Sequence, residues 1–109
     1  MSVIHFIVNW PDGDAISYCA PSTLILDYLF EGTIYNIREF DIQSRKAMHA
    51  IGNLLRNRDA SAYQITVIET ARISSKIDQL SRKAITGPVR ISGLSEWDFS
   101  DNLPMFFTP

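Results

Sequence analysis

The sequence has one cysteine, two histidines and only five glycines among its 109 residues. A single cysteine excludes an internal disulfide bond and is typical of a reducing compartment. No glycine-rich phosphate-binding loop occurs. The histidines, the cysteine and the scattered acids also lack the paired spacing of a metal site. We therefore expect neither a bound metal nor a cofactor.

Neither a basic surplus nor a long apolar run is present. The formal net charge is -2 at pH 7, whereas nucleic-acid binding requires a concentrated basic surface. The N-terminal residues lack a basic start followed by an apolar run, and no window approaches the roughly 18 apolar residues of a membrane span. We expect a cytoplasmic protein that binds neither nucleic acid nor membranes.

The length and composition predict one globular unit. A chain of 109 residues can bury a real core, and 46% hydrophobic with 20% charged residues argues against disorder. We expect residues 1–94 to form a single domain. Residues 95–109 carry aromatic and acidic side chains without periodicity, and we treat them as a C-terminal tail.

The turn Trp10-Pro11-Asp12-Gly13 predicts a hairpin. Pro11 presets the φ angle of a turn position, and Gly13 can adopt the left-handed conformation that closes a three-residue loop opposite Trp10 and Asp14. The resulting apolar face, which we expect to meet helices, pairs Val8 with Ile16, Phe6 with Tyr18 and Ile4 with Ala20. The opposite face pairs Ile7 with Ser17 and His5 with Cys19. A bulge beside Gly13 would shift this register by one residue.

The next well-marked element is a helix that begins at Ile37. Asn36 is a good N-cap, Glu39 follows three residues later as in a capping box, and Tyr35 with Phe40 can form a hydrophobic staple. Its inner face comprises Ile37, Phe40, Ser44, Ala47, Met48, Ile51, Leu54 and Leu55. Another stripe holds Arg38, Arg45, His49 and Arg56. For the short apolar segment 24–30 before it, we favour a turn of helix over a strand.

Residues 62–86 predict a second helix, although Tyr63, Ile65 and Val67 alternate as in a strand. Ser61 followed by Gln64 can cap this helix, and Gly87-Pro88 can end it. Residues 89–92 predict a third strand. The order β-β-α-α-β predicts an α+β fold, a two-layer sandwich in which two helices cover a small antiparallel sheet.

Several motifs, in this order, resemble one protein family. Residues 6–13 read F-x-V-x-W-P-D-G, and a cysteine-containing strand that ends at Pro21-Ser22 follows. The other matching positions are Asp27, Tyr28, Gly32, Tyr35, Phe40, Ser44, Arg45 and Ala47. Together they resemble a small bacterial family of nitrogen starvation response proteins, whose members are encoded in gene clusters built around a nitrilase. The resemblance covers about residues 4–50 and continues loosely to the third strand.

One position departs from the family pattern. Family members tend to read Cys-Tyr-Ser-Pro-Ser, whereas this chain has Tyr18-Cys19-Ala20-Pro21-Ser22. Because successive strand residues point to opposite faces, the exchange moves the thiol to the other face of the sheet. The resemblance implies no established catalytic activity, and the tail has no counterpart in it.

Two sets of residues are candidates for function. Cys19 and His5 could form a nucleophilic pair, but the sequence shows no orienting group or oxyanion site, so we do not assign catalytic residues. The candidate partner-binding residues are Trp97, Phe99, Phe106 and Phe107 of the tail together with Arg38 and Arg45. The alternatives are that the tail folds back onto its own domain or a neighbouring subunit, and that the arginines belong to a solvated helix face.

Two functional hypotheses follow. The leading one is a non-enzymatic accessory or regulatory protein of bacterial nitrogen metabolism that binds a protein partner of unknown identity. The other is a small enzyme that uses Cys19 and His5 on a nitrile- or amide-related substrate. Three short strands leave two open sheet edges, which are usually paired or covered. We therefore also expect a homo-oligomer, in the simplest case a dimer, with the tail in its interface.

Overall fold

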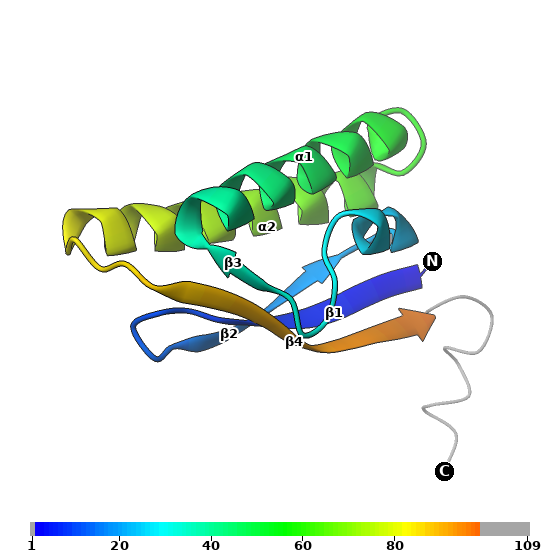
Figure 1. Cartoon of the computed structure of the whole chain (residues 1–109). Helices are drawn as coiled ribbons and strands as arrows, with labels where there is room; N and C mark the ends of the chain where they lie inside the picture. Colours follow the sequence, from blue (N-terminus) through cyan, green and yellow to red (C-terminus); the bar gives the residue numbers. More distant parts are fainter. Residues whose placement is uncertain (1, 99–109) are drawn as a thin grey trace, which may run out of the picture.

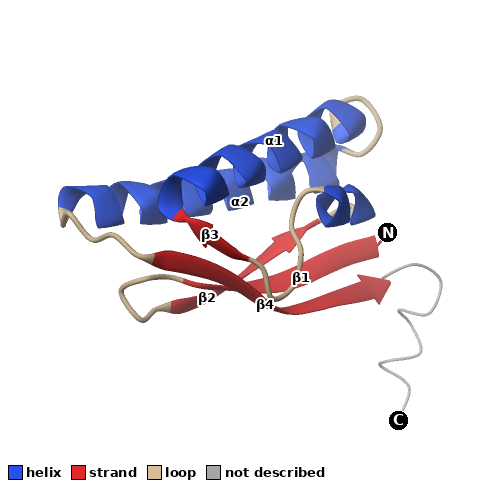
Figure 2. Ribbon diagram, viewed as in Figure 1, coloured by secondary structure: helices blue, strands red, loops and turns tan. Residues whose placement is uncertain are grey.

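The structure is a computed structural model of the chain and describes residues 2–98. Its elements are β1 (Ser2–Asn9), β2 (Ala15–Ala20), the 3-10 helix η1 (Thr23–Asp27), β3 (Ile34–Asn36), α1 (Ile37–Leu55), α2 (Ala60–Arg82) and β4 (Pro88–Asp98). The strands form one antiparallel sheet in the order β2-β1-β4-β3. Both long helices lie on the same face of this sheet (Figure 1; Figure 2). The predicted two-layer α+β fold is confirmed.

The hairpin of β1 and β2 has the predicted register. The Trp10 amide donates a hydrogen bond of 2.8 Å to the Asp14 carbonyl, and Gly13 adopts a φ of 95° at the turn. The observed pairs are Ile4 with Ala20, His5 with Cys19, Phe6 with Tyr18, Ile7 with Ser17 and Val8 with Ile16. The apolar face therefore points to the helices. His5 and Cys19 are cross-strand neighbours of the alternate set, and Cys19 lies on the edge strand β2, where its thiol reaches Glu69 of α2.

The core lies between the hairpin and α1, as predicted. Its aromatic centre includes Trp10 and Phe40, whose rings meet edge to face with centroids 5.3 Å apart. Members of the buried cluster include Phe6, Val8, Trp10, Phe40, Met48 and Ile51. This packing of the even-numbered residues of β1 fixes which side chains of α1 remain at the surface.

The start of α1 is also as predicted, but a strand precedes it. The Asn36 side chain accepts a hydrogen bond of 2.7 Å from the Glu39 amide, and the rings of Tyr35 and Phe40 lie 6.0 Å apart. Residues 34–36 form the short strand β3, so the sheet has four strands rather than three. A three-residue strand is too short to show an alternating pattern, and β3 exists because it pairs with the distant β4.

Helix α2 spans Ala60–Arg82 rather than residues 62–86, and its 62–70 segment is helical as we favoured. Its N-cap is Asp59 and not Ser61, because the Asp59 carboxylate accepts a hydrogen bond of 3.0 Å from the Ala62 amide. The helix ends before Gly87 because Ala84 adopts the left-handed conformation, with a φ of 54°. The Ile85 amide then donates to the Leu80 carbonyl at 2.9 Å, which closes a Schellman motif.

Strand β4 continues further than residues 89–92. It runs to Asp98 and therefore includes Ser95–Asp98, which the sequence placed in the tail. A register irregularity between His5 and Ile7, with Gly93 at a φ of 61°, allows β4 to keep pairing with β1. The remaining candidates of the tail, Phe99, Phe106 and Phe107, lie outside the described residues.

Candidate functional site

The single cysteine is a hydrogen-bond donor to a carboxylate. The Cys19 Sγ atom lies 3.1 Å from Glu69 Oε1, and the Cys19 amide donates to the same oxygen at 3.2 Å. Burial, followed by this hydrogen bond and by the negative charge of Glu69, raises the pKa of the Cys19 thiol to about 12. The protonated thiol is a poor nucleophile because thiol chemistry requires the thiolate.

His5 lies opposite Cys19 but contacts a different residue. Its ring centroid is 5.2 Å from that of Trp97 on β4, at an interplanar angle of 60°. Among the described residues, the Cys19 thiol donates to Glu69 and not to the His5 imidazole. The two catalytic candidates are therefore neighbours in the sheet without the hydrogen bond that would make His5 the base for Cys19.

Glu69 belongs to a row of charged residues on α2 that the sequence analysis missed. We call Glu69, Arg72 and Lys76 the α2 clamp. Arg72 pairs with Glu69 at 2.6 Å and donates to the Ser17 carbonyl at 3.2 Å. The clamp thus satisfies backbone groups of both Ser17 and Cys19 on the outer strand β2. A helix consequently covers part of a sheet edge that would otherwise invite pairing.

The third clamp residue, Lys76, fastens α2 to the hairpin turn. Its side chain is 5% exposed, and its ammonium group contacts carboxylate oxygens of Asp12 and Asp14, each at 2.6 Å. Burial alone would lower the pKa of Lys76, but the hydrogen bonds to the two carboxylates outweigh it and raise the pKa above its ordinary value. The hydrogen bond from Lys76 in turn lowers the pKa of Asp12. The i, i+3 and i+7 spacing of Glu69, Arg72 and Lys76, which places them on one face of a helix, was the sequence signal that could have indicated the clamp.

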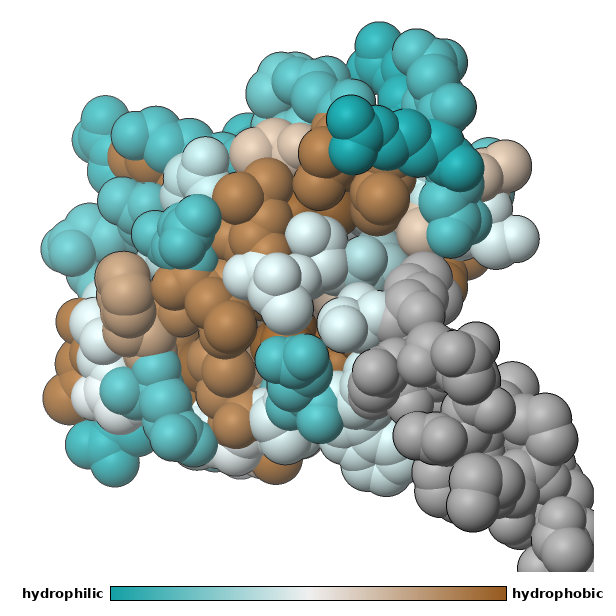
Figure 3. Space-filling model, turned by 90° about the vertical axis from the view of Figure 1, so that its right-hand side faces the viewer, coloured by the Kyte–Doolittle hydropathy of each residue, from teal (hydrophilic) through white to brown (hydrophobic). Residues whose placement is uncertain are grey.

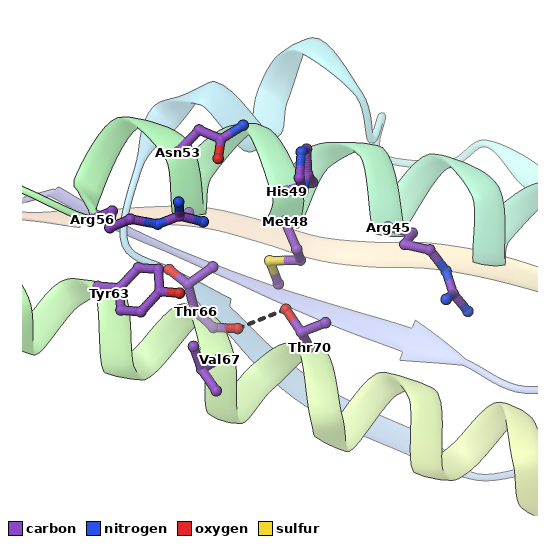
Figure 4. Close-up of a pocket in the computed structure, with 10 residues that line it drawn as sticks. Arg45, Met48, His49, Asn53, Arg56, Tyr63, Thr66, Val67 and Thr70 are labelled. Atoms are coloured by element: carbon purple, nitrogen blue, oxygen red, sulfur yellow. Dashed lines mark hydrogen bonds between the residues drawn. The ribbon is translucent and has the colours of Figure 1, made fainter.

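A groove lies between α1 and α2, with the sheet behind it (Figure 4). We call it the interhelical groove. Its lining residues are Arg45, Met48, His49, Gly52, Asn53, Arg56, Tyr63, Thr66, Val67 and Thr70, around a cavity of about 260 Å³. Buried Met48 points into it between the helices (Figure 4). Gly52 faces the Tyr63 ring, and a Cβ added at Gly52 would make an ordinary contact of 3.7 Å with Tyr63 Cε1.

The rim of this groove is basic. Arg45, His49 and Arg56 all come from α1, and none of the lining residues within 2–98 is acidic. Arg45 is 67% exposed at its side chain and pairs with Asp41 at 2.9 Å. The Arg56 guanidinium lies 5.9 Å from the centre of the Tyr63 ring. The structure thus places Arg45 at this groove together with two further residues of the predicted stripe.

Arg38, the other predicted arginine, does not line the interhelical groove. It lies in the first turn of α1, beside a different cavity that Ile77, Ser81 and Ile85 also line. Arg38 precedes Arg45 by seven positions, so the stripe read from the sequence extends beyond the groove at its N-terminal end. The two candidate arginines therefore belong to separate surface features.

Trp97 is the one tail candidate that the structure describes. It lies on β4 opposite Val3 of β1 and is 54% exposed. Figure 3 views the end of the molecule where β1 begins and β4 ends, and apolar residues reach the surface there below a hydrophilic cap. Phe30 and Ile34 are likewise more than half exposed. The sheet edge at β3 and β4 thus presents large apolar side chains.

The described part of the chain, residues 2–98, has neither a membrane-spanning helix nor a cluster of metal ligands. None of its helices is both long and apolar enough to cross a membrane. No cluster of three or more histidine, cysteine, aspartate or glutamate side chains within it could hold a metal ion.

The fold and these surfaces define a small two-layer α+β protein with a basic groove on its helical layer and a cysteine thiol that donates to Glu69 of the α2 clamp. The family model described as "Nitrogen starvation-induced protein NitG" matches residues 5–93. This match spans most of the chain, and the chain belongs to that family. No curated protein and no solved structure matches it. The resemblance to nitrogen starvation response proteins is therefore confirmed.

Proposed function

We propose that this chain is a non-enzymatic accessory or regulatory protein of the bacterial nitrogen starvation response and that it acts by binding another protein. Membership of a nitrogen starvation-induced family supports the physiological setting. The observation that carries the proposal is the hydrogen bond from the Cys19 thiol to Glu69, with the thiol pKa raised to about 12. The one cysteine of the chain thus serves to join β2 to α2.

Exposed apolar side chains support a binding role. Val67 and Ile68 on α2 are 45% and 57% exposed, and Trp97 on β4 is 54% exposed. Large apolar groups that remain at the surface in groups are typical of protein interaction sites. Val67 lies at the interhelical groove, Ile68 lies on the side of α2 next to Ile16 and Tyr18 of β2, and Trp97 lies at the sheet edge, so the protein offers several surfaces to partners.

The test is affinity capture of the full chain, carrying an affinity tag, from cells grown with and without a nitrogen source. We expect a partner that is recovered in stoichiometric amount from starved cells and that a tag-only control does not recover. Recovery of nothing above that control, together with an unchanged starvation response in a deletion strain, would contradict the proposal.

We also propose that the chain forms a homodimer through the β4 edge. The clamp engages the β2 edge, whereas β3 pairs only with Pro88–Arg90 of the much longer β4. The edge of β4 near Trp97 is thus the place where a strand of a second copy can pair with the sheet. Light scattering at micromolar concentration should give a dimer for the full chain and a monomer for Trp97→Arg. A monomeric parent chain would reject this proposal.

A further inference from the structure

We infer that the interhelical groove binds an extended segment of the partner in which two acidic residues flank an apolar one. This inference rests on the proposed function and deepens it, because it names the surface and the chemistry of the segment. The occupant follows from three features of the groove: the sign of its charge, the spacing of its cationic groups and the size of its cavity.

The charge of the groove selects an acidic occupant. The chain as a whole carries a net charge of -2, yet the described lining residues include two arginines and one histidine and no acid. Arg45 pairs with Asp41 at 2.9 Å but is 67% exposed, so its guanidinium remains accessible to a second carboxylate. Arg56 extends over Tyr63 rather than toward a carboxylate (Figure 4). Guanidinium groups form bidentate hydrogen bonds with carboxylates, so they orient an acidic segment as well as attract it.

The spacing of the arginines distinguishes a peptide from a small anion. Arg45 and Arg56 are 11 residues apart on α1, which corresponds to about 16 Å along a helix. About five residues of extended chain span that distance, which favours a peptide over a small anion. The acidic residues of the segment should therefore lie about five positions apart.

The cavity between the arginines receives the apolar residue. Its volume of about 260 Å³ is below the roughly 300–1,000 Å³ of most small-molecule sites, which suits one side chain of a longer segment. Met48 forms its floor, and Val67 from α2 adds apolar surface that is 45% exposed. Methionine adapts to side chains of different shape, so the floor accepts leucine or phenylalanine.

The experiment selects 12-residue peptides from a random display library on the full chain and measures the affinity of the enriched peptides by fluorescence anisotropy. We expect acidic–apolar–acidic sequences whose binding weakens with added salt. The double variant R45E/R56E should weaken binding about tenfold or more, since each arginine then repels its carboxylate. The control K46E/R82E reverses two exposed charges that do not line the groove and should leave binding unchanged. Val67→Asp should weaken binding, and Ile68→Asp, on a different surface of α2, should not.

Several results would overturn the inference. These are the absence of enriched peptides, enriched peptides without acids, and acidic peptides that bind R45E/R56E as well as the parent chain. Equal competition by free succinate would assign the groove to a small anion, and dissociation of a dimer in R45E/R56E would assign it to a second copy. If R45E/R56E still captures the partner from starved cells, this inference fails while the proposed function stands. Thermal melts of all variants confirm that they are folded.

Discussion

Replacing Phe6 by alanine tests the assignment of the two sheet faces. Phe6 is fully buried, and its ring centroid lies 5.8 Å from that of Tyr18 on the neighbouring strand. The change removes an aromatic ring of β1 from the core between the sheet and the helices. The lost burial contributes about 2–3 kcal/mol. A residual cavity on the order of 100 Å³ adds about 2 kcal/mol at roughly 24 cal/mol per Å³. We therefore expect the free energy of unfolding to fall by about 4 kcal/mol.

Urea denaturation followed by circular dichroism measures this loss. A domain of this size has a free energy of unfolding of about 5–15 kcal/mol, so Phe6→Ala removes a large fraction of it. Phe30→Ala is the matched control, because Phe30 is 56% exposed and should cost less than about 1 kcal/mol. A loss below about 1 kcal/mol for Phe6→Ala, or equal losses for the two variants, would refute the assignment of the faces.

The other predictions concern the clamp, the thiol and two glycines. Because folding lowers the pKa of Asp12, the ionised carboxylate stabilises the fold above the pKa that Asp12 has in the unfolded chain. This stabilisation is lost as the pH falls through the pKa that Asp12 has in the folded protein. Acid titrations of Lys76→Met should show a smaller loss of stability than those of the parent chain. Cys19, with a thiol pKa of about 12, should react with iodoacetamide at pH 8 about a thousandfold more slowly than in the urea-unfolded chain, where the pKa is about 8.5; comparable rates would contradict the clamped thiol. Gly87→Ala should lower the free energy of unfolding by about 1–3 kcal/mol, because the φ of Gly87 is 141° and an added Cβ would lie 2.8 Å from Pro11 Cβ. Gly52→Ala, inside α1 with ordinary contacts, should raise it by about 0.5–1 kcal/mol in urea melts. A change of the same sign in both variants would contradict this.

Elements with local signals could be predicted from the sequence. Pro11 and Gly13 specify the hairpin turn, and once the turn is set the register of β1 and β2 follows. Asn36 and Glu39 specify the start of α1 in the same way, because an N-cap acts within one turn of helix. The core that these two elements enclose was therefore predictable.

Elements that depend on distant contacts could not be predicted. Strand β3 and the second half of β4 acquire their structure from pairing partners elsewhere in the chain. Likewise, Lys76 and Asp12 are 64 residues apart, and Glu69 and Cys19 are 50 apart. The i, i+3 and i+7 spacing of the clamp can be read from the sequence, but no local pattern reports its distant partners, so its effect on the cysteine could not be predicted.

The candidate site was predictable only on one helix. The cationic stripe with Arg45 follows from helical periodicity. The opposite wall with Tyr63 and Val67 comes from a segment whose alternation also fitted a strand, and the groove exists only because α2 packs beside α1. The stripe read from the sequence thus contained three of the ten described lining residues, Arg45, His49 and Arg56.

The most direct test of the account is genetic complementation of a deletion strain during nitrogen starvation, with recovery of growth as the readout. Cys19→Ser keeps a donor for Glu69 and removes thiol chemistry, while R45E/R56E keeps the thiol and changes the groove. We expect Cys19→Ser to restore recovery fully and R45E/R56E to fail although it is folded and expressed. Loss of recovery with Cys19→Ser and full recovery with R45E/R56E would contradict a non-enzymatic protein that acts by binding.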